Sequence, residues 1–194
     1  DRIAALAGSD TLLLGLVRDA GLPYGLAIST GENRAIVVPF EAAEPILEAI
    51  GDGTVGVSGH DLKELARALL DLGHDLARPV MDTALASYIV NPSQRTYGLE
   101  EIAERLLGLE LVSPDEESGD GMLPFDEGPD VEMEGRRVEA VRRLVDTLHG
   151  ELEQREELDL FLTYELPLVP VLARMEHAGI GVDREYLETM GAEL

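Results

Sequence analysis

The chain has 194 residues, of which 45% are apolar, enough to bury one hydrophobic core and an appended helical piece. It contains no cysteine, which excludes disulfides and thiolate metal sites and suits a reducing cytoplasm, where we expect the protein. No apolar run reaches the roughly eighteen residues of a membrane-spanning helix, so no membrane partner is expected. The formal net charge of −24 opposes binding to a phosphate backbone, because that binding depends on Lys and Arg.

The N-terminal part of the chain predicts three strands in series. Residues 11–17 form an apolar run typical of a buried strand, and residues 24–29 and 35–40 continue the pattern. A helix is expected over residues 41–50, followed by a short strand at residues 55–57. This order is typical of a sheet with helices packed against it.

Several amphipathic helices follow. Residues 62–72 place leucines at helical spacing, with Asp61 as the expected N-cap. Residues 80–89 predict a short strand that runs into a helix, residues 99–107 predict another helix, and residues 138–162 predict a long one. The sequence therefore predicts an α/β fold with a mixed sheet flanked by helices.

Residues 113–134 differ in composition from the rest. They contain nine acidic residues, no basic residue, three prolines and three glycines. Such a segment buries too little apolar area to offset its ordering entropy, so we expect a flexible acidic insertion. Recruitment of a basic protein partner is the alternative interpretation.

The C-terminal part contains an unusual helix with two prolines. Pro167 and Pro170 each remove a backbone donor, so a helix must begin or bend there. Gly179 stands where a helix C-terminus favours a left-handed residue, and Asp183 is placed to cap a following helix.

Four segments resemble bacterial DNA polymerase I. Residues 165–183, ELPLVPVLARMEHAGIGVD, resemble the junction between its exonuclease-like and polymerase domains. Residues 80–92, VMDTALASYIVNP, and 97–107, YGLEEIAERLL, resemble a segment of the exonuclease domain. Residues 59–63, GHDLK, resemble the start of its second exonuclease motif.

The resemblance implies a ribonuclease-H-like 3′–5′ exonuclease fold over residues 1–158, and the junction with the first helices of the polymerase (thumb) domain over residues 159–194. We expect a fragment of an enzyme for DNA replication and repair synthesis. Its partners would be the polymerase domain of the same chain and, in the full-length enzyme, DNA. Mg²⁺ is expected only in that polymerase domain, and no cofactor is expected in this fragment.

The metal ligands of the active family members are missing. Those members bind two divalent metals with four acidic residues, whose charge offsets that of the metals. The first motif should be Asp-x-Glu, but the strand near Val17 has no carboxylate. The second ligand position is Leu65, and the best match to the third is Val145. The resemblance therefore implies a degenerate, metal-free proofreading domain without catalytic residues.

A weakly active exonuclease with displaced carboxylates is the second hypothesis. Its substitute ligands would be Asp19, Asp61, Glu64 and Asp146, which lie near the three motifs. Asp82 precedes a helix, and for it we favour helix capping over metal binding.

DNA binding by the fragment is expected to be weak or absent. The densest basic cluster comprises Arg136, Arg137, Arg142 and Arg143, and acidic neighbours offset it. We therefore expect a dissociation constant weaker than about 10⁻⁴ M at physiological salt.

Overall fold

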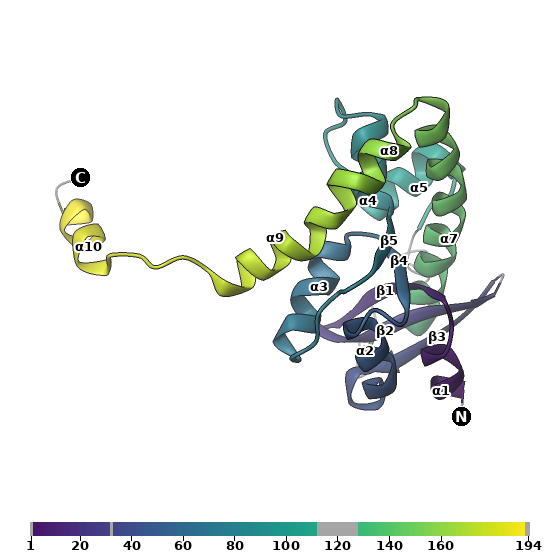
Figure 1. Cartoon of the computed structure of the whole chain (residues 1–194), viewed down its shortest axis with the longest axis horizontal. Helices are drawn as coiled ribbons and strands as arrows, with labels where there is room; N and C mark the ends of the chain where they lie inside the picture. Colours follow the sequence, from purple (N-terminus) through teal and green to yellow (C-terminus); the bar gives the residue numbers. More distant parts are fainter. Residues whose placement is uncertain (1, 32, 112–127, 193–194) are drawn as a thin grey trace, which may run out of the picture.

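The computed structural model describes residues 2–31, 33–111 and 128–192 (Figure 1). Within these residues the strands form one five-stranded sheet of order β3-β2-β1-β4-β5. β1, β2 and β3 are antiparallel neighbours, whereas β4 runs parallel to β1 and β5 parallel to β4. The predicted mixed α/β sheet is confirmed. The strands are β1 (Thr11–Asp19), β2 (Leu22–Gly31), β3 (Arg34–Pro39), β4 (Gly56–Gly59) and β5 (Pro79–Asp82).

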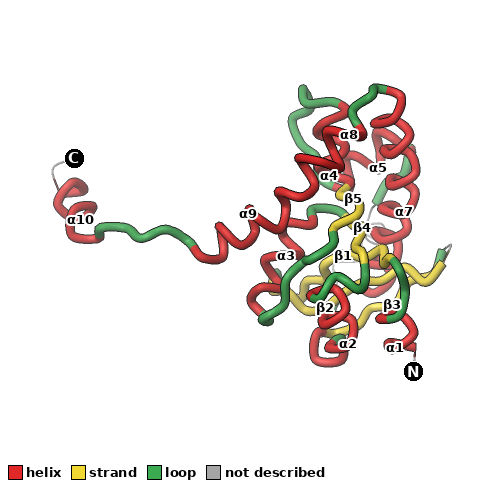
Figure 2. Tube along the Cα trace, viewed as in Figure 1, coloured by secondary structure: helices red, strands yellow, loops and turns green. Residues whose placement is uncertain are grey.

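Helices cover both faces of the sheet (Figures 1 and 2). Strand residues alternate between the faces, so Leu12 and Leu14 of β1 belong to the main core with the leucines of α2 and α3. Val17 lies on the other side, in a small cluster with Ala27 and Val138 of α7. The helices of the body are α1 (Arg2–Ala7), α2 (Glu44–Gly51), α3 (Leu62–Asp71), α4 (Thr83–Val90), α5 (Leu99–Leu107) and α7 (Val131–Gln154).

Helix α7 begins earlier than the sequence suggested. Asp130 accepts a hydrogen bond from the backbone N–H of Met133 at 2.9 Å and so caps the helix. Met133 and Glu134 are both buried. The assignment of residues 131–134 to the acidic insertion was therefore wrong, since burial of Met133 compensates for the acidic composition. Residues 113–127 lie outside the described part of the chain.

The expected single helix over residues 138–162 is in fact broken. α7 ends at Gln154, and Glu156 has a φ of 61°, which is incompatible with a continuing helix. α8 (Leu158–Leu160) then leads through one π-helical segment, η2 (Phe161–Glu165), into α9 (Leu166–Ala178). The π segment ends two residues before Pro167, which lies in the first turn of α9, while Pro170 lies inside the helix.

The C-terminal residues form an arm that leaves the body. α9 packs along α3, but residues 179–183 are extended and α10 (Arg184–Ala192) lies apart from the rest (Figures 1 and 2). Asp183 caps α10 as predicted, because it accepts a bond from the N–H of Tyr186 at 3.0 Å. None of the described helices is long and apolar enough to cross a membrane.

Candidate functional site

A cleft of about 310 Å³ opens between β1, the start of α3, α5 and α7. β1, α3 and α7 are the elements on which the three exonuclease motifs were expected. Its apolar lining comes from Leu16, Leu99, Val138 and Val141. Its charged and polar lining comes from Arg18, His60, Asp61, Glu64, Glu100, Glu134 and Arg137. The cleft thus contains carboxylates and guanidinium groups together.

Arg137 binds two of the cleft carboxylates. Its Nη1 lies 3.1 Å from Oε1 of Glu134, and its Nη2 lies 2.8 Å from Oε1 of Glu100. Glu134 is only 8% exposed, and this burial raises its pKa against the opposing effect of Arg137. The guanidinium therefore supplies the counter-charge that a buried carboxylate needs.

Glu64 is also held by arginines. Its Oε2 lies 3.0 Å from Nη2 of Arg18 in β1, and its Oε1 lies 2.9 Å from Nη1 of Arg67, one turn along α3. Both oxygens therefore accept from guanidinium groups, which compete with any metal for this side chain.

Asp82 caps two helices with one buried carboxylate. It accepts bonds from the backbone N–H groups of Ala84 at 3.0 Å and Leu85 at 3.3 Å, as predicted for the start of α4. It also accepts bonds from the backbone N–H groups of Asp61 at 3.2 Å and Leu62 at 2.8 Å, at the start of α3. Burial raises the pKa of Asp82 to about 6, despite the opposing effect of these backbone donors.

Asp61 does not cap α3 as the sequence suggested. Its backbone is left-handed, with φ 53° and ψ 58°, and its side chain makes no capping hydrogen bond. The prediction was wrong because Asp82, twenty-one positions later in the chain, reaches the same helix end. The turn at Asp61 leaves this residue on the wall of the cleft.

His60 lines the cleft and contacts Thr83. Its Nδ1 lies 2.9 Å from Oγ1 of Thr83, whose hydroxyl lies 3.3 Å from the carbonyl oxygen of Gly59. If the hydroxyl donates to that carbonyl, Nδ1 is the donor to Thr83, and Nε2 carries the lone pair. Burial lowers the pKa of His60, with nearby carboxylates acting in the opposite direction.

The three positions proposed as lost ligands are apolar and lie around the cleft rather than in its lining. Val17 is fully buried in the small cluster under α7, and Leu65 is 2% exposed in the main core. Val145 packs against the main core, whereas the α7 residues that line the cleft lie one to three turns earlier, at Glu134, Arg137, Val138 and Val141. On β1, Gly15 lines the cleft, and a Cβ placed there would lie 3.7 Å from Val138.

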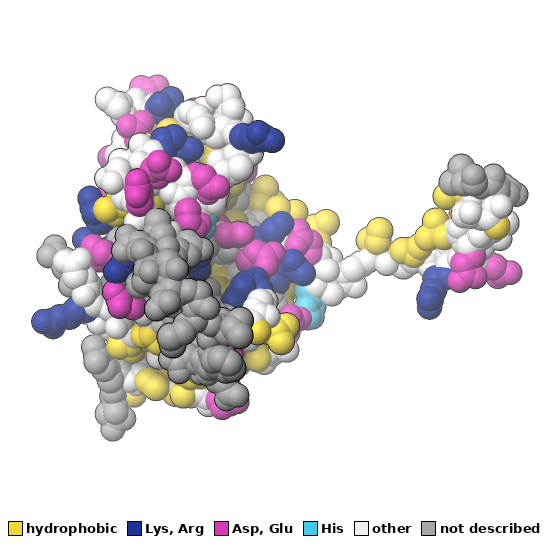
Figure 3. Space-filling model, turned by 180° about the vertical axis from the view of Figure 1, so that it is seen from behind, with side chains coloured by type: hydrophobic (Ala, Val, Ile, Leu, Met, Phe, Trp, Pro, Cys, Tyr) yellow, Lys and Arg dark blue, Asp and Glu magenta, His cyan; other side chains and the backbone are white. Residues whose placement is uncertain are grey.

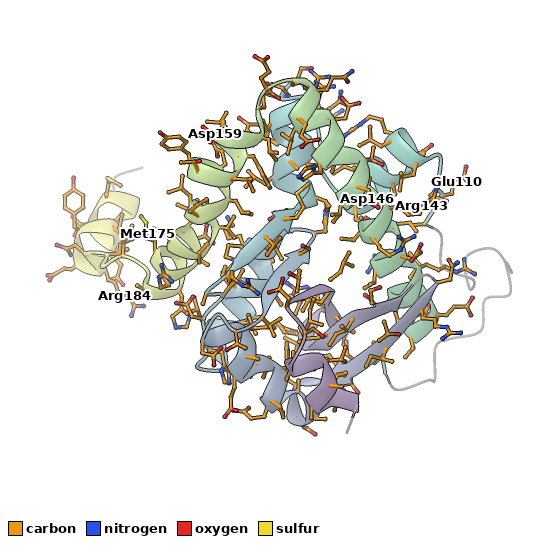
Figure 4. All side chains as sticks on the ribbon, turned by 45° about the vertical axis from the view of Figure 1, so that its right-hand side comes forward. Glu110, Arg143, Asp146, Asp159, Met175 and Arg184 are labelled. Carbon is orange, nitrogen blue, oxygen red and sulfur yellow. The ribbon has the colours of Figure 1, made fainter. Side chains whose placement is uncertain are left out.

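The substitute ligands of the second hypothesis are not brought together as a set. Asp61 and Glu64 line the cleft, but Asp19 does not, and Asp146 lies on an exposed part of α7 (Figure 4). Across residues 2–31, 33–111 and 128–192, no three His, Asp or Glu side chains form a group that could hold a metal ion. Of the four substitute ligands, the described cleft therefore contains two, Asp61 and Glu64.

A second groove, of about 480 Å³, adjoins the first and shares His60 and Asp61 with it. Tyr88 and Tyr97 contribute to one side, with their ring centroids 5.4 Å apart in an edge-to-face arrangement. The other side is formed by apolar residues of α9, namely Leu168, Val169 and Leu172.

The sequence reasoning missed the arginines as site residues. Arg137 and Glu134 are three positions apart on one helix, which is a readable signal. The sequence indicated that acidic neighbours offset the arginine cluster, but not that Arg137 lies in the cleft. The pairings of Arg18 with Glu64 and of Arg137 with Glu100 span 46 and 37 positions and have no local signal.

Sequence comparison identifies relatives of this chain. DNA polymerase I of Bacillus subtilis is 37% identical over 137 residues, which are 69% of this chain and 16% of that protein. DNA polymerase I of Geobacillus stearothermophilus is 34% identical over 175 residues, 88% of this chain and 20% of that protein. This chain is homologous to a segment of bacterial DNA polymerase I. It spans about a fifth or less of the length of these relatives, and no family model matches it.

Solved structures agree with this relationship. The POL domain of Pol1 from M. smegmatis, in a complex with DNA primer-template and dNTP, matches with a TM-score of 0.79 and 27% identity, over 99% of this chain and 33% of that one. Brucella melitensis NrnC matches at TM-score 0.70 and 19% identity, over 88% of this chain and 86% of that one. Escherichia coli RNase D matches with a TM-score of 0.68 and 14% identity, over 90% of this chain and 48% of that one. This chain, a homologue of polymerase I, thus has the expected 3′–5′ exonuclease-like fold.

Proposed function

We propose that this segment of a DNA polymerase I is a metal-free, catalytically inactive exonuclease-like module that supports the polymerase domain of the same protein. The main observation is the cleft, in which Glu64, Glu100 and Glu134 are bound to arginines. Without a set of free carboxylates, no water is activated by metals and the leaving oxygen is not stabilised. For the whole protein, the homology supports cytoplasmic DNA replication and repair synthesis, with DNA and Mg²⁺ bound by the polymerase domain.

The C-terminal arm supports the structural part of the proposal. α10 has nine residues and none is buried, although helices shorter than about 12–15 residues are marginal alone in water. Apolar side chains follow the arm, with Ile180 91%, Val182 56% and Tyr186 64% exposed (Figure 3). Met175 and Arg184 lie on either side of the extended link (Figure 4). We infer that the polymerase domain covers this surface.

A nuclease assay tests the inactive cleft. The chain is incubated with a labelled single strand and Mg²⁺ or Mn²⁺, with an active exonuclease as positive control. We expect the strand to stay intact for hours. EDTA-sensitive shortening would instead support weak catalysis by Asp61 and Glu64, the two substitute ligands that line the cleft. In that case D61N/E64Q should abolish the shortening.

Limited proteolysis tests the arm. Trypsin should cleave rapidly after Arg184 in the 194-residue chain, because the link and α10 are exposed. In full-length polymerase I the same bond should be protected. Equal cleavage rates in the two proteins would refute the proposed contact with the polymerase domain.

A further inference from the structure

One arginine connects two helices across the cleft. Arg137 lies on α7 and contacts Glu134 on the same helix at 3.1 Å and Glu100 on α5 at 2.8 Å. A guanidinium is planar, always charged and able to donate to two carboxylates at once. Arg137 thereby connects the start of α7 to α5 through ionic hydrogen bonds.

A second arginine connects a strand to a helix on the opposite wall. Arg18 of β1 donates through Nη2 to Glu64 of α3 at 3.0 Å and through Nη1 to the carbonyl oxygen of Gly21 at 3.1 Å. Arg67 holds the other oxygen of Glu64. The glutamates that line the cleft are thus each paired with an arginine of the same chain, namely Glu64, Glu100 and Glu134.

Neighbouring carboxylates destabilise a fold unless a cation offsets their repulsion and desolvation. In a two-metal nuclease the divalent ions provide this charge and tie together the elements that carry the ligands. We propose that Arg137, with Arg18, is a built-in counter-ion that replaces bound metal in this cleft and holds α5 to α7 and β1 to α3. This inference rests on the proposed metal-free state.

The role of Arg137 is tested by thermal unfolding of the 194-residue chain. R137Q keeps a polar side chain but leaves Glu100 and Glu134 without their cation. We expect Tm to fall by roughly 4–8 °C, less than for a fully buried pair because Arg137 is partly exposed. The matched control is R136Q on the same helix, whose exposed pair with Glu132 should contribute almost nothing.

Two further measurements separate charge from packing. E134Q/R137Q removes both charges, so its Tm should lie above that of R137Q. Mn²⁺ at about 5 mM should raise the Tm of R137Q by about 2–4 °C relative to NaCl of equal ionic strength, as for a site with a dissociation constant near 1 mM. The double variant and the wild-type chain should show no such response.

The outcomes are distinguishable. The counter-ion role is refuted if R137Q is as stable as R136Q, if E134Q/R137Q is no more stable than R137Q, or if Mn²⁺ does not stabilise R137Q. A Mn²⁺ response of the wild-type chain would instead refute the metal-free state on which the inference rests. The fall in Tm, the recovery in the double variant and the cation response restricted to R137Q together support it.

Discussion

Replacing Asp82 by alanine should destabilise the protein strongly, because one carboxylate caps both α3 and α4. Asp82 is 3% exposed and accepts bonds from four backbone N–H groups, at 2.8, 3.0, 3.2 and 3.3 Å. Loss of a cap costs typically about 1–2 kcal/mol at each helix end. For two ends we expect a loss of about 3 kcal/mol in the free energy of unfolding, or about 6–12 °C in Tm for a chain of this size.

Urea unfolding followed by circular dichroism at pH 7.5 measures the effect, and an unchanged denaturant slope would show that only stability differs. The control is D61G. Asp61 makes no capping bond and has a φ of 53°, which glycine adopts without strain, so D61G should be neutral or stabilising. A loss below about 1 kcal/mol in D82A, or an equal loss in D61G, would refute the double-cap assignment.

The remaining predictions concern pH, packing and DNA. Burial raises the pKa of Asp82 to about 6. This lies above the unfolded value of about 3.9, so protonation favours the folded state, and the contribution of Asp82 to stability should increase by up to about 3 kcal/mol as the pH falls from about 6 to 4. A carboxyl ¹³C resonance that titrates below pH 4 would contradict this. F161A removes a fully buried ring and should cost about 3–5 kcal/mol, whereas L162A, at an exposed neighbour, should change stability by less than about 0.5 kcal/mol. Fluorescence anisotropy with a labelled primer–template should give a dissociation constant weaker than about 10⁻⁴ M at ~150 mM salt, and saturable binding at low micromolar concentration would be inconsistent with the charge of −24.

Local patterns in the sequence were enough to predict several elements. The helix Leu99–Leu107 was predicted with its observed bounds, because its amphipathic repeat and flanking glycines are contained in one short segment. The capping of α4 by Asp82 and of α10 by Asp183 also involves residues two or three positions apart. The relationship to polymerase I was visible for the same reason, since its motifs are continuous runs of residues.

The chemistry of the cleft was decided only by tertiary structure. Glu64 meets Arg18 because β1 and β4 pair in a register that brings α3 beside β1, and Glu100 meets Arg137 because α7 packs on α5. Asp82 reaches the start of α3 because β5 ends beside β4. The helical spacing of the leucines was enough to predict that Leu65 faces inward. The pairing of charges depends instead on contacts between elements far apart in the chain. Such contacts leave no periodic signal in the sequence.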